Sequence, residues 1–200
     1  AGGVLGTGPG LMNYPLVISD PDRPGRYYLS ANQVWSSADF GETWVQRGEI
    51  PDQSRVFLVG QSPVTGLLLD PLDHEVLFAA KGDKVWLSET AAPQWSEVSQ
   101  IRPGRSILAL AFHPADATGM YAATTDGLYL SEDRAQTWKK LLAPEGVLWN
   151  SVRLRFDPHD PNHFYLVTSR TLYESGDAGQ TWAEVSQQFG GLPWFNDLAF

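Results

Sequence analysis

Residues Ser131 to Trp138 read "SEDRAQTW", and the same spacing of Ser, Asp, Thr and Trp occurs elsewhere in the chain. It returns as "SADFGETW" from Ser37 and as "SGDAGQTW" from Ser175, and a worn copy, "SETAAPQW", begins at Ser88. The four copies start 43 to 51 residues apart. A period of that size is typical of propellers and solenoids, so the fold prediction rests on the spacing of this motif.

Each copy lies in a repeated frame of short apolar segments. An apolar strand ending in a Pro turn comes first, a hairpin of two strands follows, and a last strand leaves after the Trp of the motif. Four antiparallel strands with turn signals every 8–12 residues predict an all-β chain. Such a small sheet cannot cover both of its faces alone, so it must stack on neighbouring sheets, as the blades of a β-propeller do.

The repeat also predicts the domain organisation. We expect one propeller domain with blades at 14–50, 62–100, 106–142 and 150–188, and the first strand of a further blade at 194–200. Four blades form an arc, so we expect remaining blades or another chain to close the ring, because an open blade edge invites strand pairing.

Composition narrows the classes of partner. The net charge is −9 and Lys and Arg do not cluster, which argues against nucleic acid. No apolar run is long enough to span a membrane. The chain has no Cys, which excludes disulfides and thiolate zinc sites. Four histidines lie in or beside the Pro turns and so recur with the repeat: His74, His113, His159 and His163. The segment that contains His159 and His163 is interpreted as a solvated turn, and we predict no metal and no cofactor.

The pattern S-x-D-x-G-x-T-W resembles the Asp-box, or BNR repeat, of sialidase-, sortilin- and xyloglucanase-like propellers. The surrounding frame is similar to that of bacterial Asp-box repeat proteins. The resemblance implies a propeller, and an extracellular or periplasmic location. It does not imply one function, because the family includes glycosidases, sugar-binding modules, receptors and assembly factors.

The residues of the motif favour a structural role. Ser and Asp side chains stabilise turns by bonding to backbone N–H groups, Gly tolerates a positive φ, and Trp buries a large ring. Ala135 replaces this Gly in the third copy, so that turn either relaxes or carries strain of about 1–2 kcal/mol. The residues assigned to this role are Ser37, Asp39, Gly41, Thr43, Trp44, Ser88, Trp95, Ser131, Asp133, Thr137, Trp138, Ser175, Asp177, Gly179, Thr181 and Trp182.

Ligand candidates are expected on the face opposite the motifs. Propeller topology places the Pro turns and the motifs together, and the resemblance implies that ligands meet the other face, where the central hairpin tips and the loops between blades lie. Two inner-strand arginines, expected to find a carboxylate or an anion, complete the set. The candidates are Asp83, Asp126 and Arg170 at tips, Arg105, Trp149, Asn150, Trp194 and Asn196 in loops, and Arg153 and Arg155 on the inner strand.

Two functions remain open. A non-catalytic binding or assembly module requires only a shaped face with aromatic and charged groups, and its ligand would be a glycan or a protein. A glycoside hydrolase would require two carboxylates in one cleft, or, in sialidase-like chemistry, an Arg cluster and a Tyr–Glu pair. Neither set is evident in the sequence, so we favour the binding module.

Overall fold

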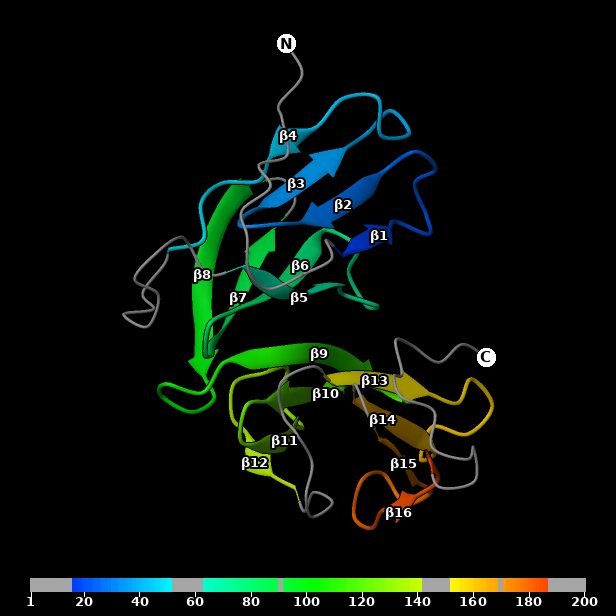
Figure 1. The fold of residues 1–200 in the computed structure, drawn as a ribbon. Helices are drawn as coiled ribbons and strands as arrows, with labels where there is room; N and C mark the ends of the chain where they lie inside the picture. The colour runs from blue at the N-terminus through cyan, green and yellow to red at the C-terminus, as the bar shows by residue number, and fades with distance from the viewer. Residues whose placement is uncertain (1–15, 52–62, 90–91, 142–151, 169–170, 187–200) are drawn as a thin grey trace.

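The computed structural model describes residues 16–51, 63–89, 92–141, 152–168 and 171–186. This part of the chain folds into four antiparallel sheets of four strands each, in chain order within every sheet (Figure 1). We call the sheets blades 1 to 4 and their strands a to d. Among the described residues there is no helix that is both long and apolar enough to cross a membrane.

The strands are short, and each blade follows one copy of the repeat. Blade 1 contains β1 (Val17–Ser19), β2 (Tyr27–Ser30), β3 (Val34–Ser37) and β4 (Val45–Gln46), and blade 2 contains β5 (Val64–Leu69), β6 (Val76–Lys81), β7 (Lys84–Glu89) and β8 (Ala92–Gln100). Blade 3 contains β9 (Ile107–His113), β10 (Asp116–Thr124), β11 (Gly127–Ser131) and β12 (Lys139–Lys140). Blade 4 contains β13 (Val152–Phe156), β14 (Phe164–Thr168), β15 (Leu172–Ser175) and β16 (Ala183–Glu184).

The a strands lie next to one another and the blades fan outward from them. β5 neighbours both β1 and β9, and β9 neighbours β13 (Figure 1). This succession of stacked four-stranded blades confirms the predicted all-β propeller architecture.

The core consists of layers between consecutive blades. In β6, Leu77 and Ala79 pack against blade 1, whereas Phe78 and Ala80 pack against blade 3, and all four are fully buried. The two sides of a strand alternate, so a central blade buries both of its faces. We call the face toward the next blade in chain order the outgoing face and the opposite one the incoming face.

An aromatic ring on strand b recurs at the outgoing face. Phe78 packs edge-on against Phe112 of blade 3, with ring centroids 5.7 Å apart. Its counterpart Tyr121 packs against Phe156 and Phe164 of blade 4, at 5.5 and 5.0 Å. Such aromatic pairs contribute about 0.5–1.5 kcal/mol of stabilisation beyond that from burying the rings.

The Asp-box closes the turn between strands c and d through its own side chains. Ser131 Oγ donates to Asp133 Oδ1 at 2.8 Å and accepts the Ala135 N–H at 2.9 Å. Asp133 in turn accepts the backbone N–H and the hydroxyl of Thr137 at 2.8 and 2.5 Å. These bonds, the Thr137 hydroxyl first, lower the pKa of Asp133 to about 2. The boxes that begin at Ser37 and Ser175 have the same bonds.

In blade 2, which has the incomplete copy of the box, strands β7 and β8 extend into the box itself. β7 and β8 stay paired as far as Glu89 and Ala92, beyond the point where the other boxes leave the ladder. Ser88 Oγ here donates to the Glu89 carbonyl at 3.3 Å. Blade 2, whose box lacks the Asp and the Gly, thus pairs strands c and d within the box, with an irregular register between Leu87 and Glu89.

Two box tryptophans join their blade to the preceding one. Trp95 Nε1 donates to the Arg47 carbonyl of blade 1 at 2.6 Å, and Trp138 Nε1 donates to Ser99 Oγ of blade 2 at 2.9 Å. Ser99 Oγ donates onward to the Ala135 carbonyl. The box thus contributes to blade stacking as well as to its own turn.

Ala135 carries the strain that its position implied. Its φ is 68°, so the turn has not relaxed around the replacement of Gly by Ala. Its methyl group is fully buried in the core between blades 2 and 3. Burial of that methyl offsets part of the roughly 1–2 kcal/mol that a left-handed Ala costs.

Alanine at the corresponding glycines tests this balance. A Cβ at Gly179 would lie 3.1 Å from Phe164 Cζ and 3.3 Å from Leu141 Cδ1, whereas one at Gly41 would lie 3.6 Å from Trp44. We expect Gly41→Ala to cost about 1 kcal/mol, from backbone strain, and Gly179→Ala at least about 1 kcal/mol more, from crowding. Urea unfolding of the two variants measures this, and equal losses would contradict the packing at Gly179.

Candidate functional site

The loop between blades 2 and 3, residues 101–106, lies beside the tips of the b–c hairpins. Asp83, in the β6–β7 turn, accepts the Gly104 N–H at 2.7 Å and Gln100 Nε2 at 3.0 Å. The Ile101 N–H also donates to the Asp83 carbonyl at 3.0 Å, and the Ile107 N–H to the Gly82 carbonyl at 2.7 Å. This tip therefore holds both ends of the loop.

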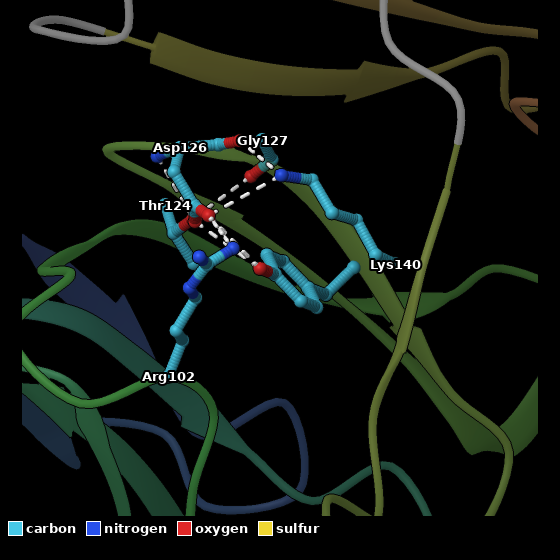
Figure 2. Close-up of polar contacts among 6 residues, drawn as sticks. Arg102, Thr124, Asp126, Gly127 and Lys140 are labelled. Atoms are coloured by element: carbon cyan, nitrogen blue, oxygen red, sulfur yellow. Dashed lines mark hydrogen bonds and ion pairs between the residues drawn. The ribbon is translucent and has the colours of Figure 1, made fainter.

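The tip of blade 3 holds the same loop through a second carboxylate. Arg102 Nη1 donates to Asp126 Oδ2 at 2.6 Å, and Lys140 Nζ reaches the same oxygen at 3.2 Å and the Asp126 carbonyl at 2.6 Å (Figure 2). Thr124 Oγ1 and the Tyr129 hydroxyl donate to Asp126 Oδ1 at 2.8 and 3.2 Å. Three segments, the loop, the hairpin and β12, meet at this one side chain.

Gly127 gives Lys140 its path to the tip. Its φ is 147°, and a Cβ there would lie 2.7 Å from Lys140 Cε. The "DG" pair thus does more than make a tight hairpin, because it also admits a cation from strand d. Figure 2 shows the Lys140 side chain extending past Gly127 toward Asp126.

The surroundings keep Asp126 ionised. Partial burial alone would raise its pKa, but hydrogen bonds from Thr124 and Lys140, the charge of Lys140 and the bond from Tyr129 outweigh burial, and the pKa is lowered. A general acid requires the opposite shift, toward a protonated carboxyl at neutral pH. Asp126 is therefore suited to holding the tip together and not to donating a proton.

The cations around the tips form a basic surface on an acidic protein. The side chains of Arg102 and Lys140 are 52% and 45% exposed although both bond to Asp126. Arg105 is exposed, and its guanidinium bonds to no other described residue. We call Arg102, Arg105 and Lys140 the basic loop face. Against the two carboxylates at the tips, Asp83 and Asp126, these three cations leave an excess of one positive charge.

The inner-strand arginines lie elsewhere. Arg153 and Arg155 are half-buried on the outgoing face of blade 4, where Arg155 pairs across the sheet with Tyr165. Arg155 Nη1 donates to the Leu154 carbonyl at 3.0 Å. Both side chains extend from a sheet face, so the structure does not bring them together with the basic loop face.

The same face of blade 4 holds a cluster that sequence reasoning missed. His163 lies between Glu174, at 2.6 Å, and Asp157, at 3.3 Å, so it is not part of a merely solvated turn as expected. The Tyr165 hydroxyl donates to Glu174 at 3.3 Å. This Tyr–Glu pair lies on a sheet face rather than at the hairpin tips. Neither this cluster nor any other group of three or more His, Cys, Asp or Glu side chains among the described residues is arranged so that it could hold a metal ion.

Lys81 is a second residue that the sequence did not single out. It ends β6 and is buried, and its Nζ donates to the carbonyls of Asn32 and Ile50 at 3.2 and 3.0 Å. Gln33 bonds to both backbone groups of Ile50. A Lys at the end of an otherwise apolar strand is the signal that could have indicated this cross-blade contact.

Five predicted candidates lie outside the described residues: Trp149, Asn150, Arg170, Trp194 and Asn196. Of the others, Asp83, Asp126 and Arg105 come together at the tips. Arg102 and Lys140 join them, and no sequence argument had paired Lys140 with Asp126.

Removing the Asp83 carboxylate tests how the loop is held. In Asp83→Ala, we expect the Gly104 amide to exchange hydrogen about fivefold faster, because one bond worth about 1 kcal/mol is lost. Asp73→Ala is the matched control, since Asp73 accepts the Glu75 N–H at 2.9 Å in a Pro turn. Unchanged exchange at Gly104 in Asp83→Ala would contradict this role.

Comparison with known proteins places this geometry among propellers. A crystal structure of an ancestral GH74 enzyme has a TM-score of 0.65 at 19% identity, over 83% of this chain and 23% of that one. The GH74 xyloglucanase from Xanthomonas campestris has a TM-score of 0.65 at 20% identity, over 82% of this chain and 28% of that one. YCF48 bound to D1 peptide has a TM-score of 0.63 at 19% identity, over 98% of this chain and 61% of that one.

The chain therefore spans about a quarter of the GH74 enzymes and about three fifths of YCF48. At these identities the likeness shows the fold alone. No curated protein matches the sequence. The family model described as Sortilin-Vps10 (sortilin, neurotensin receptor 3) matches residues 83–198, which is more than half of the chain. The chain thus belongs to the Sortilin-Vps10 family of Asp-box propellers.

Proposed function

We propose that this chain is a non-catalytic binding module whose basic loop face captures a carboxylate-bearing segment of a protein. The proposal is supported by the charge of this face, which differs from that of the whole chain. The chain carries a net charge of −9, whereas Arg102, Arg105 and Lys140 lie beside two hairpin tips. An acidic segment would meet cations there and repulsion over much of the remaining surface.

The proposal rests on the hydrogen bonds that the two carboxylates at the hairpin tips already accept. Asp126 accepts bonds from Arg102, Lys140, Thr124 and Tyr129, and Asp83 accepts bonds from Gln100 and Gly104. A glycosidase uses one carboxyl as an acid and another as a base or nucleophile. Two carboxylates already committed to holding a loop are poorly suited to either role.

Arg105 is the residue that we expect to meet the ligand first. Its guanidinium is exposed on a loop whose two flanks bond to Asp83 and Asp126. A cation on a preorganised loop loses less conformational entropy on binding than one on a free chain. Arg also binds carboxylates in a two-pronged geometry that Lys does not reproduce.

The structural neighbours are compatible with either ligand class. YCF48 has been solved with a peptide and the GH74 enzyme from Xanthomonas campestris is a xyloglucanase, but both resemble this chain in fold alone. The charge of the loop face makes us prefer an acidic protein segment to a neutral glycan. A location outside the cytoplasm, implied by the family resemblance, is part of this proposal.

A peptide array tests the proposal. Each short acidic peptide is paired with a version in which Gln and Asn replace Glu and Asp, and binding is measured for the native chain, Arg105→Ala and Lys139→Ala. Lys139 is an exposed cation next to Lys140, but it pairs with Leu130 and so points to the other side of the sheet. We expect acidic peptides to bind preferentially, and Arg105→Ala to weaken binding about tenfold.

Three results would contradict the proposal. One is equal binding of the acidic and neutral peptides, and another is an equal effect of Arg105→Ala and Lys139→Ala. The third is release of reducing sugar from a polysaccharide that Asp126→Asn abolishes, which would instead favour the glycoside hydrolase.

A further inference from the structure

The sequence Arg-Pro-Gly-Arg occurs twice in the chain, at residues 23–26 and at residues 102–105. The first copy lies between β1 and β2, and the second lies in the loop between blades 2 and 3 that supplies the basic loop face. Pro fixes φ near −65° at the second position of a turn, and Gly accepts a positive φ at the third. The same four residues should therefore form the same turn in both places.

Both copies do form one kind of tight turn. The Arg26 N–H donates to the Arg23 carbonyl at 3.0 Å, and the Arg105 N–H donates to the Arg102 carbonyl at 3.1 Å. The glycines at the third position have φ values of 87° and 73°. A Pro followed by a Gly of positive φ defines a type II turn, in which the first and fourth Cα atoms lie less than about 7 Å apart. Each turn thus brings two arginines close together.

The first turn holds a carboxylate of the chain itself. Glu75, which directly precedes β6 in blade 2, accepts an ion pair from Arg23 Nη2 through Oε1. Its other oxygen, Oε2, lies 3.9 Å from Arg26 Nη1. Each arginine of the turn thus faces one oxygen of the same carboxylate. Residues 23–26 therefore show how this turn binds a carboxylate within the protein.

The second turn has no such carboxylate between its arginines. Arg102 Nη1 donates to Asp126 Oδ2 at 2.6 Å, as Figure 2 shows, whereas the Arg105 guanidinium bonds to no other described residue. No carboxylate in the described part of the chain therefore bridges Arg102 and Arg105. The turn itself is held in place, because Asp83 accepts the Gly104 N–H at 2.7 Å.

The bond to Asp126 leaves Arg102 able to bind a second carboxylate. A guanidinium has five N–H donors, and Arg23 shows that one such group can serve two carboxylates. Its Nη1 lies 3.9 Å from Asp20 Oδ2 while its Nη2 pairs with Glu75. Arg102 likewise presents Nη1 to an Asp of the chain, and its side chain is 52% exposed.

The second turn is also less covered than the first. A Cβ at Gly25 would lie 2.9 Å from Phe40 Cε2, so the Phe40 ring packs on the first turn. A Cβ at Gly104 would meet nothing within 4 Å. A ligand could therefore approach residues 102–105 from this side without displacing a side chain.

We propose that residues 102–105 bind one carboxylate of the ligand between Arg102 and Arg105, as residues 23–26 bind Glu75. This inference rests on the proposed function and refines it, because it makes Arg102 a second ligand-binding residue and a single carboxylate the group that is recognised. Guanidinium groups form short, charge-assisted hydrogen bonds to carboxylates. Two of them at fixed separation hold the carboxylate in one orientation.

An NMR titration of the full chain with three peptides tests the recognised group. All three share an acetylated Gly-Ser host sequence: one carries a single Glu and an amidated end, one a single Gln and a free C-terminal carboxylate, and one a single Gln and an amidated end. We expect the Glu peptide to bind at least about tenfold more tightly than the amidated Gln peptide. The Nε–H signals of Arg102 and Arg105 should follow one binding curve. The peptide with the free C-terminus distinguishes a terminal carboxylate from a side chain as its source.

Variants of the two turns test the clamp. We expect Arg102→Ala and Arg105→Ala each to weaken binding of the Glu peptide about tenfold. The double variant should lose far less than the roughly hundredfold expected of independent contacts, because both arginines hold one group. Arg23→Ala is the matched control, since its turn already holds Glu75, and we expect no change.

Gly104 variants test the conformation of the turn. Since a Cβ there meets no neighbour, any effect must come from the backbone. Asn tolerates a positive φ and Val does not, so we expect Gly104→Asn to bind the Glu peptide like the native chain and Gly104→Val to bind it about tenfold more weakly.

The outcomes separate this inference from the proposed function. A loss of binding in Arg105→Ala but not in Arg102→Ala would overturn the clamp and leave the proposed function in place. An additive loss in the double variant, or equal binding by the two Gly104 variants, would do the same. Equal losses in Arg23→Ala and Arg102→Ala would also overturn the clamp. Equal binding of all three peptides would overturn both proposals.

Discussion

Strand b of each central blade packs against two neighbours at once, and the remaining structure depends on that constraint. Leu77 and Ala79 of β6 face one blade while Phe78 and Ala80 face the next, and Tyr121 of β10 repeats the aromatic contact one blade further on. With both faces buried, the polar groups of the chain are left for the ends of the strands. This is why most of the side-chain hydrogen bonds among the described residues lie in boxes, Pro turns, hairpin tips and loops.

The two ends of the blades use carboxylates in a similar way. At the box end, Asp133 accepts the N–H and hydroxyl of Thr137, and at the tip end Asp83 and Asp126 hold the loop of residues 101–106. The hydrogen bonds that Asp133 and Asp126 accept lower the pKa of both carboxyls, in Asp126 against the opposite effect of its partial burial. The hydrogen bonds that stabilise these turns thus also make the carboxyls poor proton donors, which favours a binding role for this surface over a catalytic one.

Much of this could be predicted from spacing, because a repeat places equivalent residues at equivalent points. Counting back five residues from the box Ser locates Asp83 and Asp126 at their tips, and the box itself predicts the propeller. The approach of Lys140 and Arg102 to Asp126 could not be predicted, since it depends on how β12 and the loop that precedes blade 3 converge. The sequence also could not decide whether the turn at Ala135 relaxes or keeps a positive φ, because the answer depends on the burial of the Ala135 methyl group.

We propose that Asp126 joins the loop, the hairpin and β12 as a charged carboxylate and does not act as a catalytic acid. A carbon-detected NMR titration of its carboxyl group measures this directly. We expect a pKa below the ordinary 3.8, so that the contribution of Asp126 to folding stability is present above that value and is lost as the pH falls through its lowered pKa. A pKa raised to about 6, as in a general acid, would contradict the account.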